Sequence, residues 1–473
     1  MTGELHYLGL LDVSERIRRQ ELTSEAVTSA LLERIRIHDG RLNSILMLLG
    51  DRALEEARRA DAEIASGFWR GPLHGVPVGI KDLLWMESLP TTGGMAIMKD
   101  FRPDEDATVV TRLRQAGAVP IAKLHTTEGA THAHHPDFPR PQNPWAAAHW
   151  TGVSSSGSGV AVAAGFCYGA LGTDTGGSIR MPSAANNLTG IKPTWGRVSR
   201  YGLMPLSESL DHIGPMARSV GDAAAILQVI AGPDAKDPTA LQDPVPDYGA
   251  ASSGDLGDVV IGIDWEYATG GMPEPIVEAL RNAVDIFSGL GARIRPITFP
   301  AEAGELGQAM AILSAEAAAA HADDFPEKAE QYGPGLSNWL TRAAKLGPLD
   351  VARAYQRKDR FTGRVRCLFA EVGLVLTPGL GAILPTWEEM EALGNDMESQ
   401  AWAKAFGTLG RFTPPFNLAG TPTLSFPGGF TADGLPIGLQ LAGWKLAEPL
   451  LIRAGAAFQR RTDFHTRHPE LVA

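Results

Sequence analysis

Cysteine is nearly absent from this chain of 473 residues, which contains only two. Cys167 and Cys367 lie far apart, and neither belongs to a CxxC pair. A disulfide framework and a cysteine-rich zinc site both need several closely spaced cysteines, so the pattern argues against both. The scarcity of cysteine indicates a reducing compartment. We expect Cys167, within a run rich in glycine and alanine, to be a small buried residue rather than a nucleophile.

An excess of positive charge and a long apolar run are also missing. Lysine and arginine number 42 against 54 aspartates and glutamates, a net charge of −12. Nucleic acids and anionic membranes bind basic surfaces, so neither is an expected partner. The longest weakly polar run, at residues 157–172, is too short and too rich in glycine to span a bilayer. Charged residues interrupt positions 1–20, which leaves no signal-peptide core, and we expect a cytoplasmic protein.

The chain does have enough apolar sequence for a large core, because 44% of its residues are hydrophobic. Short apolar runs at residues 76–80, 118–124 and 259–263 predict strands, and the stretch at residues 108–116 between the first two predicts a helix. Strands that alternate with helices are typical of an α/β sheet. Apolar residues at helical spacing predict further helices, which begin near Thr23, Asp51 and Pro275.

Changes of pattern along the chain divide one large domain into four segments. Residues 1–70 predict an N-terminal helical segment packed on the core, and residues 71–240 contain the core with the candidate catalytic residues. Residues 241–410 predict a variable, mostly helical region that shapes the substrate site. Residues 411–473 return to glycine, proline and β-formers, and predict the strands and helix that complete the core.

Two serines lie in glycine-rich turns that suggest catalysis. Ser154 belongs to GVSSSGS at residues 152–158, and Ser178 belongs to GTDTGGSIR at residues 172–180. A serine hydroxyl becomes a nucleophile when a base removes its proton. Lys81 follows a short apolar run, and burial there would lower its pKa enough for it to act as that base.

Each of these features taken singly also has a structural explanation. An isolated lysine is most often a solvated surface residue, and a serine- and glycine-rich run is often a flexible loop. Two glycines before Ser178 allow a tight turn whose N–H groups point inward, which suits an oxyanion hole, a phosphate-binding nest or a plain turn. The function therefore depends on whether the three features occur in a larger pattern.

Such a pattern is present, and it resembles the amidase signature family. The similarity covers most of the chain, and the motifs occur in the order that the family shows. They are GVPVGIKD at residues 75–82, TTGG at 91–94, DAT at 106–108, LRQAGA at 113–118, NPW at 143–145, the whole run 152–193, IKPT at 191–194, GPMARSV at 214–220, PFNLAGTP at 415–422 and GLPIGLQ at 434–440.

The resemblance implies a Ser-cisSer-Lys triad on a large, mixed, twisted sheet covered on both faces by helices. Ser178 matches the nucleophile, Ser154 matches the bridging serine that follows a cis peptide bond, and Lys81 matches the base. Val153 and Ser156 stand where the family usually has glycine, so Ser155 is the alternative bridging serine. No metal and no organic cofactor is expected.

The resemblance also implies roles for the neighbouring residues. The backbone N–H groups of Thr175, Gly176, Gly177 and Ser178 match the oxyanion hole. We expect Asp174 and Arg180 to be structural, because a free charge beside the nucleophile would perturb its base. Three further positions are predicted to border the substrate: Gly129, Ala130 and Met181.

A histidine-rich loop follows these positions. His132, His134 and His135 precede a proline-rich stretch that ends at Pro141. Imidazoles close in sequence are common metal ligands, but this spacing is not a known zinc pattern and no cysteine or acidic residue completes a tetrahedral set. We therefore expect no metal site, and interpret the loop as a proline-stiffened segment beside the active site.

These observations predict a serine-dependent hydrolase of C–N bonds that forms an acyl-enzyme on Ser178. Its expected substrate is a small-molecule amide or carbamate, with ester hydrolysis as a side activity. Two alternatives stay open: a glutamine-hydrolysing amidotransferase A-type subunit that works with a partner on aminoacyl-tRNA, and a catalytically silent binding protein. Met181 stands where amidotransferase subunits of the family commonly carry glutamine, which favours a stand-alone amidase. Homo-oligomers are compatible with the sequence.

Overall fold

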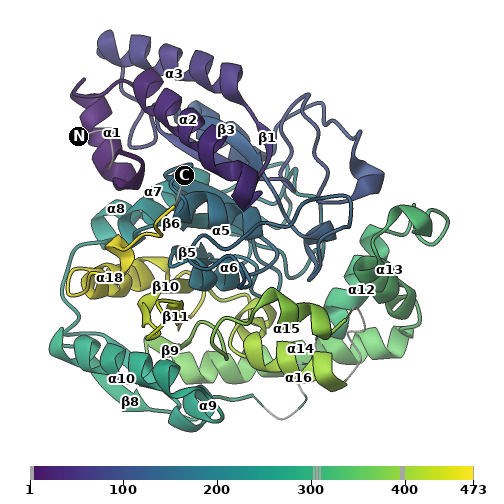
Figure 1. The fold of residues 1–473 in the computed structure, drawn as a ribbon. Coiled ribbons are helices and arrows are strands. Elements are labelled where there is room, and N and C mark those ends of the chain that lie inside the picture. The colour runs from purple at the N-terminus through teal and green to yellow at the C-terminus, as the bar shows by residue number, and fades with distance from the viewer. Residues whose placement is uncertain (1–4, 302–303, 305–306, 308–309, 395–399, 472–473) are drawn as a thin grey trace.

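The computed structural model describes residues 5–301, 304, 307, 310–394 and 400–471. Within these residues, eleven strands form one mixed sheet in the order β1-β3-β2-β4-β6-β5-β10-β11-β9-β7-β8 (Figure 1). The strands are β1 (Ile45–Leu48), β2 (Pro77–Lys81), β3 (Val119–Leu124), β4 (Gly169–Thr173), β5 (Thr189–Lys192), β6 (Ile213–Ala217), β7 (Val260–Ile263), β8 (Arg293–Pro296), β9 (Leu374–Pro378), β10 (Thr423–Phe430) and β11 (Pro436–Gly443).

Helices surround this sheet. The described α-helices are α1 (Leu10–Arg18), α2 (Ser24–Leu42), α3 (Gly50–Ala65), α4 (Thr108–Gln115), α5 (Ser156–Ala163), α6 (Arg180–Ala185), α7 (Val220–Ile230), α8 (Tyr248–Ala251), α9 (Trp265–Thr269), α10 (Glu274–Gly289), α12 (Ala311–Ala320), α13 (Pro334–Ala343), α14 (Pro348–Phe369), α15 (Trp387–Ala392), α16 (Gln400–Leu409), α17 (Pro414–Leu418) and α18 (Glu448–Gln459). The predicted fold, a large mixed sheet between helical layers, is confirmed.

Strand β4 shows how the two faces of the sheet are covered. Side chains alternate between the faces of a strand, so Gly169 and Gly172 face opposite sides. A Cβ on Gly169 would meet Ile226 of α7, whereas a Cβ on Gly172 would meet Ser155, which immediately precedes α5. Helix α7 contacts α4 and α18, and α18 contacts α10, while α5 contacts α6. Both faces of the central strands are therefore closed to water.

The predicted elements that position the candidate residues are present. The runs at residues 76–80, 118–124 and 259–263 correspond to β2, β3 and β7, and residues 108–116 correspond to α4. The Thr23 hydroxyl accepts the Ala26 N–H and begins α2, as its capping role predicts. Strands β2 and β3 run parallel, and β2 also pairs in parallel with β4.

Strand β1 lies in a segment that the sequence predicted to be helical. The segment 1–70 is mostly helical, but residues Ile45–Leu48 pair antiparallel with β3. Four apolar residues between two helices show no clear period, and their conformation depends on a partner strand distant in sequence. The segment thus contributes an edge strand to the sheet.

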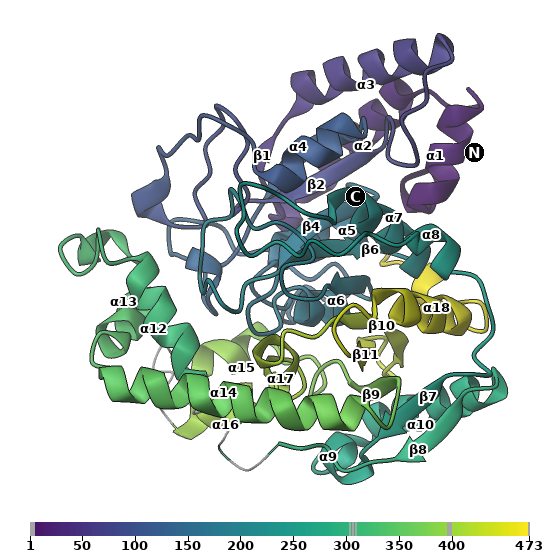
Figure 2. The same ribbon diagram turned by 180° about the vertical axis from the view of Figure 1, so that it is seen from behind.

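The region 241–410 contributes strands as well as helices. Strands β7, β8 and β9 extend the sheet at one end, where α9 and α10 also lie, whereas α1, α2 and α3 lie at the opposite end (Figures 1 and 2). Helix α12 contacts both α13 and α14. Helices α12 and α13 lie at the side of the molecule in both views, and α14 extends from them across its lower part. None of the helices in the described ranges combines the length and apolar character needed to cross a bilayer.

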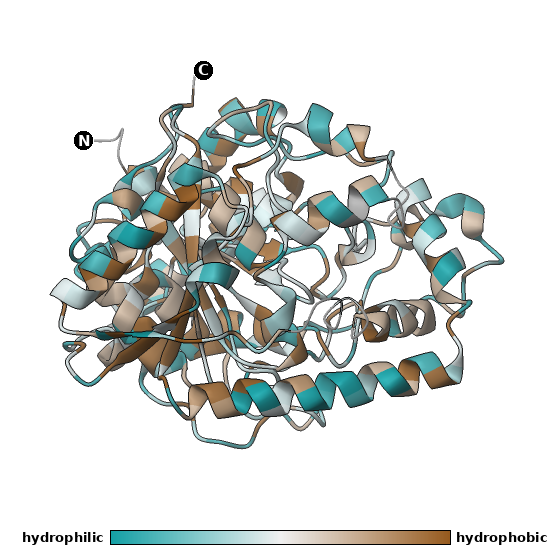
Figure 3. Cartoon of the chain, turned by 90° about the horizontal axis from the view of Figure 1, so that it is seen from below, coloured by the Kyte–Doolittle hydropathy of each residue, from teal (hydrophilic) through white to brown (hydrophobic). Residues whose placement is uncertain are grey.

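Hydrophobic residues gather along the strands and on the inward sides of the helices (Figure 3). Phe287 of α10 illustrates this packing, since it is fully buried between Phe426 and Phe458. Its ring centroid lies 5.3 Å from that of Phe458 and 6.3 Å from that of Phe426. This aromatic cluster joins α10 and α18 to β10.

We expect Phe287→Ala to lower the free energy of unfolding by about 3–5 kcal/mol, because it leaves a cavity inside the aromatic cluster. The measurement is urea unfolding followed by tryptophan fluorescence. Phe68→Ala is the matched control, since Phe68 is 56% exposed, and its effect should stay within about 0.5 kcal/mol. Equal effects of the two substitutions would contradict this description of the core.

Candidate active site

Lys81 is the last residue of β2, and its side chain is completely buried. The amine nitrogen lies 2.8 Å from the Ser154 hydroxyl oxygen, 2.9 Å from that of Ser155 and 2.7 Å from that of Thr173. Thr173 ends β4, the parallel neighbour of β2. The carboxyl ends of adjacent parallel strands are a common place for functional residues, and here they bring the lysine against three hydroxyl groups.

The surroundings of Lys81 favour its neutral form. Burial lowers the pKa of Lys81 well below its usual range, and the negative charges of Asp174 and Asp211 oppose this only in part. A neutral amine has two hydrogens and one lone pair. Of the three hydroxyl groups around the nitrogen, one must then donate its hydrogen to the amine. This arrangement allows the lysine to accept a proton from a hydroxyl.

The hydrogen bonds of Ser155 distinguish it from Ser154. The Ser155 hydroxyl donates to the Thr173 carbonyl over 3.2 Å and accepts the Thr173 N–H, also over 3.2 Å. Its single hydrogen is thereby used in anchoring the chain to β4. The hydroxyls of Ser154 and Thr173 are left as those that can donate to the Lys81 amine.

The two serine turns meet at this point. The peptide bond between Val153 and Ser154 is cis. The Ser154 carbonyl accepts hydrogen bonds from the Thr126 hydroxyl, at 3.0 Å, and from the Thr127 N–H, at 3.3 Å. The Ser155 N–H in turn donates to the Ser178 carbonyl over 3.3 Å. The fold thus brings together the three predicted catalytic residues, Lys81, Ser154 and Ser178.

A buried ion pair shapes the turn that carries Ser178. The Asp174 carboxylate accepts two hydrogen bonds from the Arg180 guanidinium, each 2.9 Å long, and both side chains are fully buried. It also accepts the N–H groups of Gly177 and Ile179 and the side-chain amide of Asn417. Although burial alone would raise it, these partners hold the pKa of Asp174 well below its usual range. Asp174 and Arg180 are therefore paired with each other, as expected.

The N–H groups of this turn have different partners. Gly177 uses its N–H in the 2.8 Å bond to Asp174. Within the described ranges, the N–H groups of Thr175, Gly176 and Ser178 make no hydrogen bond to another protein group. Ser178 is 8% exposed, and Gly176 is the most accessible residue of the turn. Of the four N–H groups predicted to form an oxyanion hole, these three therefore remain available to bind an oxyanion, and that of Gly177 does not.

Gly177 itself cannot be replaced without moving its neighbours. Its φ angle is +136°, a region that other residues avoid. A Cβ there would lie 2.5 Å from the Thr413 hydroxyl oxygen and 2.9 Å from the terminal methyl group of Met181. Met181, one of the predicted substrate residues, therefore lies directly against the turn.

Sequence reasoning missed two polar residues that support the site. Thr173 lies within the GTDTGGSIR motif, but its contact with Lys81 becomes evident only from the pairing of β2 and β4. The Asp211 carboxylate accepts the Thr175 hydroxyl over 2.6 Å and the N–H groups of Leu206 and Ser207. Burial raises the pKa of Asp211 to about 6. No local signal marks Asp211, because its partner lies far away in the sequence.

The other two predicted substrate residues lie in the short 3-10 helix η3 (Glu128–Ala130). Gly129 and Ala130 both have positive φ angles, of 54° and 60°. The buried Glu128 carboxylate accepts the Gly333 N–H over 2.8 Å, at the residue before α13. Burial raises the pKa of Glu128 to about 7. This segment therefore connects the catalytic loops to the helical region.

The three histidines of the loop have separate contacts. The His134 ring lies 3.1 Å from the Ser156 hydroxyl through Nε2, and His135 accepts the Asp137 N–H through Nδ1. The His132 ring packs edge-on against Phe406. Burial lowers the pKa of His132 to about 4 and that of His134 to about 3, so both are neutral at pH 7. The loop, like Ser156, lies beside the candidate catalytic serines.

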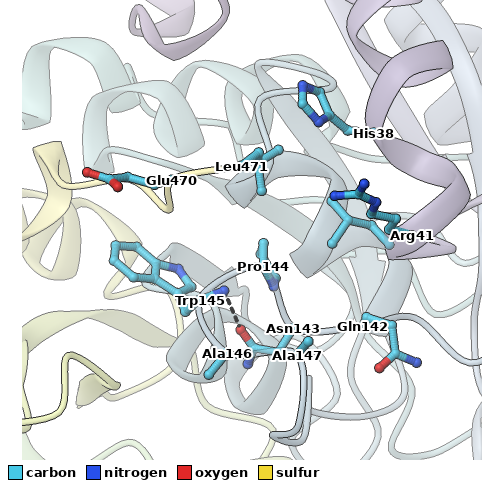
Figure 4. Close-up of a pocket in the computed structure, with 11 residues that line it drawn as sticks. His38, Arg41, Gln142, Asn143, Pro144, Trp145, Ala146, Ala147, Glu470 and Leu471 are labelled. Carbon is cyan, nitrogen blue, oxygen red and sulfur yellow. Dashed lines mark hydrogen bonds between the residues drawn. The ribbon is translucent and has the colours of Figure 1, made fainter. Parts of the chain in front are cut away.

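A separate cavity of about 190 Å³ lies between α2 and the C-terminal residues. Figure 4 shows its lining, with the Asn143 side chain accepting the Trp145 N–H over 2.9 Å. His38 and Arg41 line the cavity from α2, and Glu470 and Leu471 line it from the C-terminal segment. None of the candidate catalytic residues lines this cavity.

Comparisons with known proteins agree with this site. The family described as Amidase matches residues 26–452. Putative amidase AmiD from Mycobacterium tuberculosis (strain ATCC 25618 / H37Rv) is 44% identical over 465 residues, which cover 98% of this chain and 96% of the relative. A glutamyl-tRNA(Gln) amidotransferase subunit from Roseiflexus sp. (strain RS-1) is 40% identical over 494 residues, which cover 99% of each chain. The structure of 6-aminohexanoate cyclic dimer hydrolase complexed with substrate matches with a TM-score of 0.89 and 26% identity, over 98% of this chain and 99% of that one.

Similarity of this extent to named amidases and to solved amidase structures defines the class of the protein as an amidohydrolase. More particularly, the chain belongs to the amidase signature family. The family resemblance seen in its motifs is thereby confirmed.

We expect Asp211→Asn to move the acidic limb of the kcat/KM profile to lower pH. The ionised Asp211 carboxylate raises the pKa of Lys81, so its removal should allow the amine to stay neutral in more acidic solution. The asparagine oxygen can still accept the Leu206 and Ser207 N–H groups, while its amide group donates to the Thr175 hydroxyl oxygen. The measurement is hydrolysis of an amide substrate between about pH 5 and 9.

Glu208→Gln serves as the control for this experiment, because the Glu208 side chain is 73% exposed and its removal changes the net charge equally. A limb that does not move in Asp211→Asn, or that moves to higher pH, would show that Asp211 has no electrostatic influence on the base.

Proposed function

We propose that the protein is a serine amidase that forms an acyl-enzyme on Ser178. The observation that carries this proposal is the completely buried Lys81 amine in contact with three hydroxyl groups. A lysine in this setting is neutral and can act as a base at ordinary pH. The hydrogen bonds of Ser155 to β4 support Ser154 as the residue that relays the proton.

The contacts of Lys81 support the following reaction. Lys81 accepts the proton of the Ser154 hydroxyl, which accepts that of Ser178, and the Ser178 oxygen attacks the substrate carbonyl. The N–H groups of Thr175, Gly176 and Ser178 stabilise the negative charge on the carbonyl oxygen. The same relay in reverse protonates the departing amine as the C–N bond breaks. Water then attacks the acyl-enzyme, and its proton returns to the relay as Ser178 is released.

The second candidate function is that of an amidotransferase subunit. It is favoured by the 40% identity to a glutamyl-tRNA(Gln) amidotransferase subunit over 99% of the chain. Such a protein would hydrolyse glutamine and work with a partner. Met181 against Gly177 presents an apolar surface beside the nucleophile, which supports a stand-alone amidase for apolar substrates instead.

Purification and activity distinguish these two functions. A stand-alone amidase should purify without a partner chain, and it should hydrolyse simple amides, esters or carbamates alone. Co-purification of a partner from the native host, together with glutaminase activity and no turnover of simple amides, would establish the amidotransferase function instead.

We expect Ser178→Ala to abolish covalent labelling by a fluorophosphonate probe, because the substitution removes the attacking oxygen. Mass spectrometry of the intact protein detects the adduct, and circular dichroism checks the fold. Ser253→Ala is a suitable control, since Ser253 is an exposed serine that should not affect labelling. Full labelling of Ser178→Ala would refute the assignment of Ser178 as the nucleophile. A wild-type protein that never reacts with the probe would instead favour a catalytically silent binding protein.

A further inference from the structure

A cavity of about 370 Å³ lies between the histidine loop and the helices α15 and α16. This volume falls within the range of about 300–1,000 Å³ that small-molecule sites occupy. The loop that precedes the serine turn contributes Trp150 to its wall. Its walls include the side chains of His132, His134, Trp150, Trp387, Met390 and Phe406.

Apart from Arg140 and Glu391, the lining of this cavity consists of aromatic rings, including imidazoles, and of small or apolar residues. The rings of Trp150 and Phe406 meet edge to face, with centroids 6.4 Å apart. His132 and His134 are neutral at pH 7, because burial lowers the pKa of both. Such walls bind apolar or aromatic groups through burial of surface and ring packing.

The two charged residues that line the cavity neutralise each other. The Arg140 guanidinium forms an ion pair with the Glu391 carboxylate. It also lies over the Trp387 ring, 4.0 Å from the centroid, in cation–π geometry. A substrate group with its own charge would therefore gain no matching partner here, whereas an aromatic ring would extend the existing packing.

The candidate catalytic residues do not line this cavity, but two of its lining residues, His134 and Trp150, pack beside the serine turns. The His134 ring contacts the Ser156 hydroxyl at 3.1 Å, two residues after the proposed relay serine. Trp150 belongs to one apolar cluster with Val153, which precedes that serine, and with Met181, which lies against Gly177. Trp150 thus belongs both to the wall of the cavity and to the apolar cluster that reaches Met181, beside Gly177.

We propose that this cavity binds an aromatic or bulky apolar substituent of the amide substrate, and that the natural substrates are amides of this class. The proposal rests on the proposed function, since it places the scissile carbonyl at Ser178. It gives the histidine-rich loop a role in substrate recognition rather than in metal binding.

The test compares kcat/KM for bulky and small amides in matched pairs. One pair varies the acyl side, phenylacetamide against acetamide, and the other varies the amine side, N-benzylacetamide against N-methylacetamide. The wild-type protein should prefer the aromatic member of at least one pair. Phe406→Ala should reduce that preference at least tenfold, since it removes a wall of the cavity. Phe68→Ala, the same change at an exposed phenylalanine, should leave the preference unaltered.

Met390→Trp is the second variant, because it fills the cavity instead of enlarging it and should also reduce the preference at least tenfold. Fluorophosphonate labelling of every preparation reports the fraction of reactive serine. Loss of preference in either pair supports the proposal, and the responding pair identifies the side of the amide that enters the cavity. A preference unchanged in both variants, or absent from a wild-type protein that labels normally, overturns the cavity assignment but not the serine mechanism. A wild-type protein that fails to label overturns both.

Discussion

Burial of the Lys81 amine is the constraint on which the catalytic site depends. An ammonium group removed from water needs a close anion, and the two nearest carboxylates have other partners. Asp174 pairs with Arg180, and Asp211 binds Thr175 and backbone amides. Lys123, also buried, provides the contrast, because its amine lies 2.7 Å from the Asp82 carboxylate. Among the described residues, the hydrogen-bond partners of the Lys81 amine are hydroxyl groups, and this environment favours a neutral base.

The surrounding structure holds three hydroxyl groups against this amine and fixes the turn that carries Ser178. Parallel pairing of β2 with β4 brings Lys81 beside Thr173, and the hydrogen bonds of Ser155 tie the serine loop to the same strand. The Asp174–Arg180 pair then fixes the turn of Ser178. Removal of one member of such a buried pair typically lowers the free energy of unfolding by about 3–5 kcal/mol. The Asp174–Arg180 pair therefore stabilises the fold as well as shaping the site.

Much of the fold and of the site could be predicted from the sequence. Alternating apolar runs identified β2, β3 and β7, and the ordered motifs identified Lys81, Ser154 and Ser178 as a group. Residues that act through tertiary contacts could not be found in this way. Asp211 reaches the site only because it meets Thr175 across the fold, and β1 is a strand only because β3 lies beside it. The proposed role of the histidine loop in substrate binding could not be predicted either, because the helices α15 and α16 that complete the cavity are distant from the loop in sequence.

The protonation state of Lys81 tests this account most directly. Nuclear magnetic resonance of protein labelled with ¹³C at the lysine ε carbon can follow each lysine during a pH titration, and a Lys81→Arg spectrum assigns the Lys81 signal. The account predicts that Lys81 titrates well below the exposed lysines, because burial lowers its pKa. A Lys81 signal that titrates together with those of the exposed lysines would contradict a neutral lysine base.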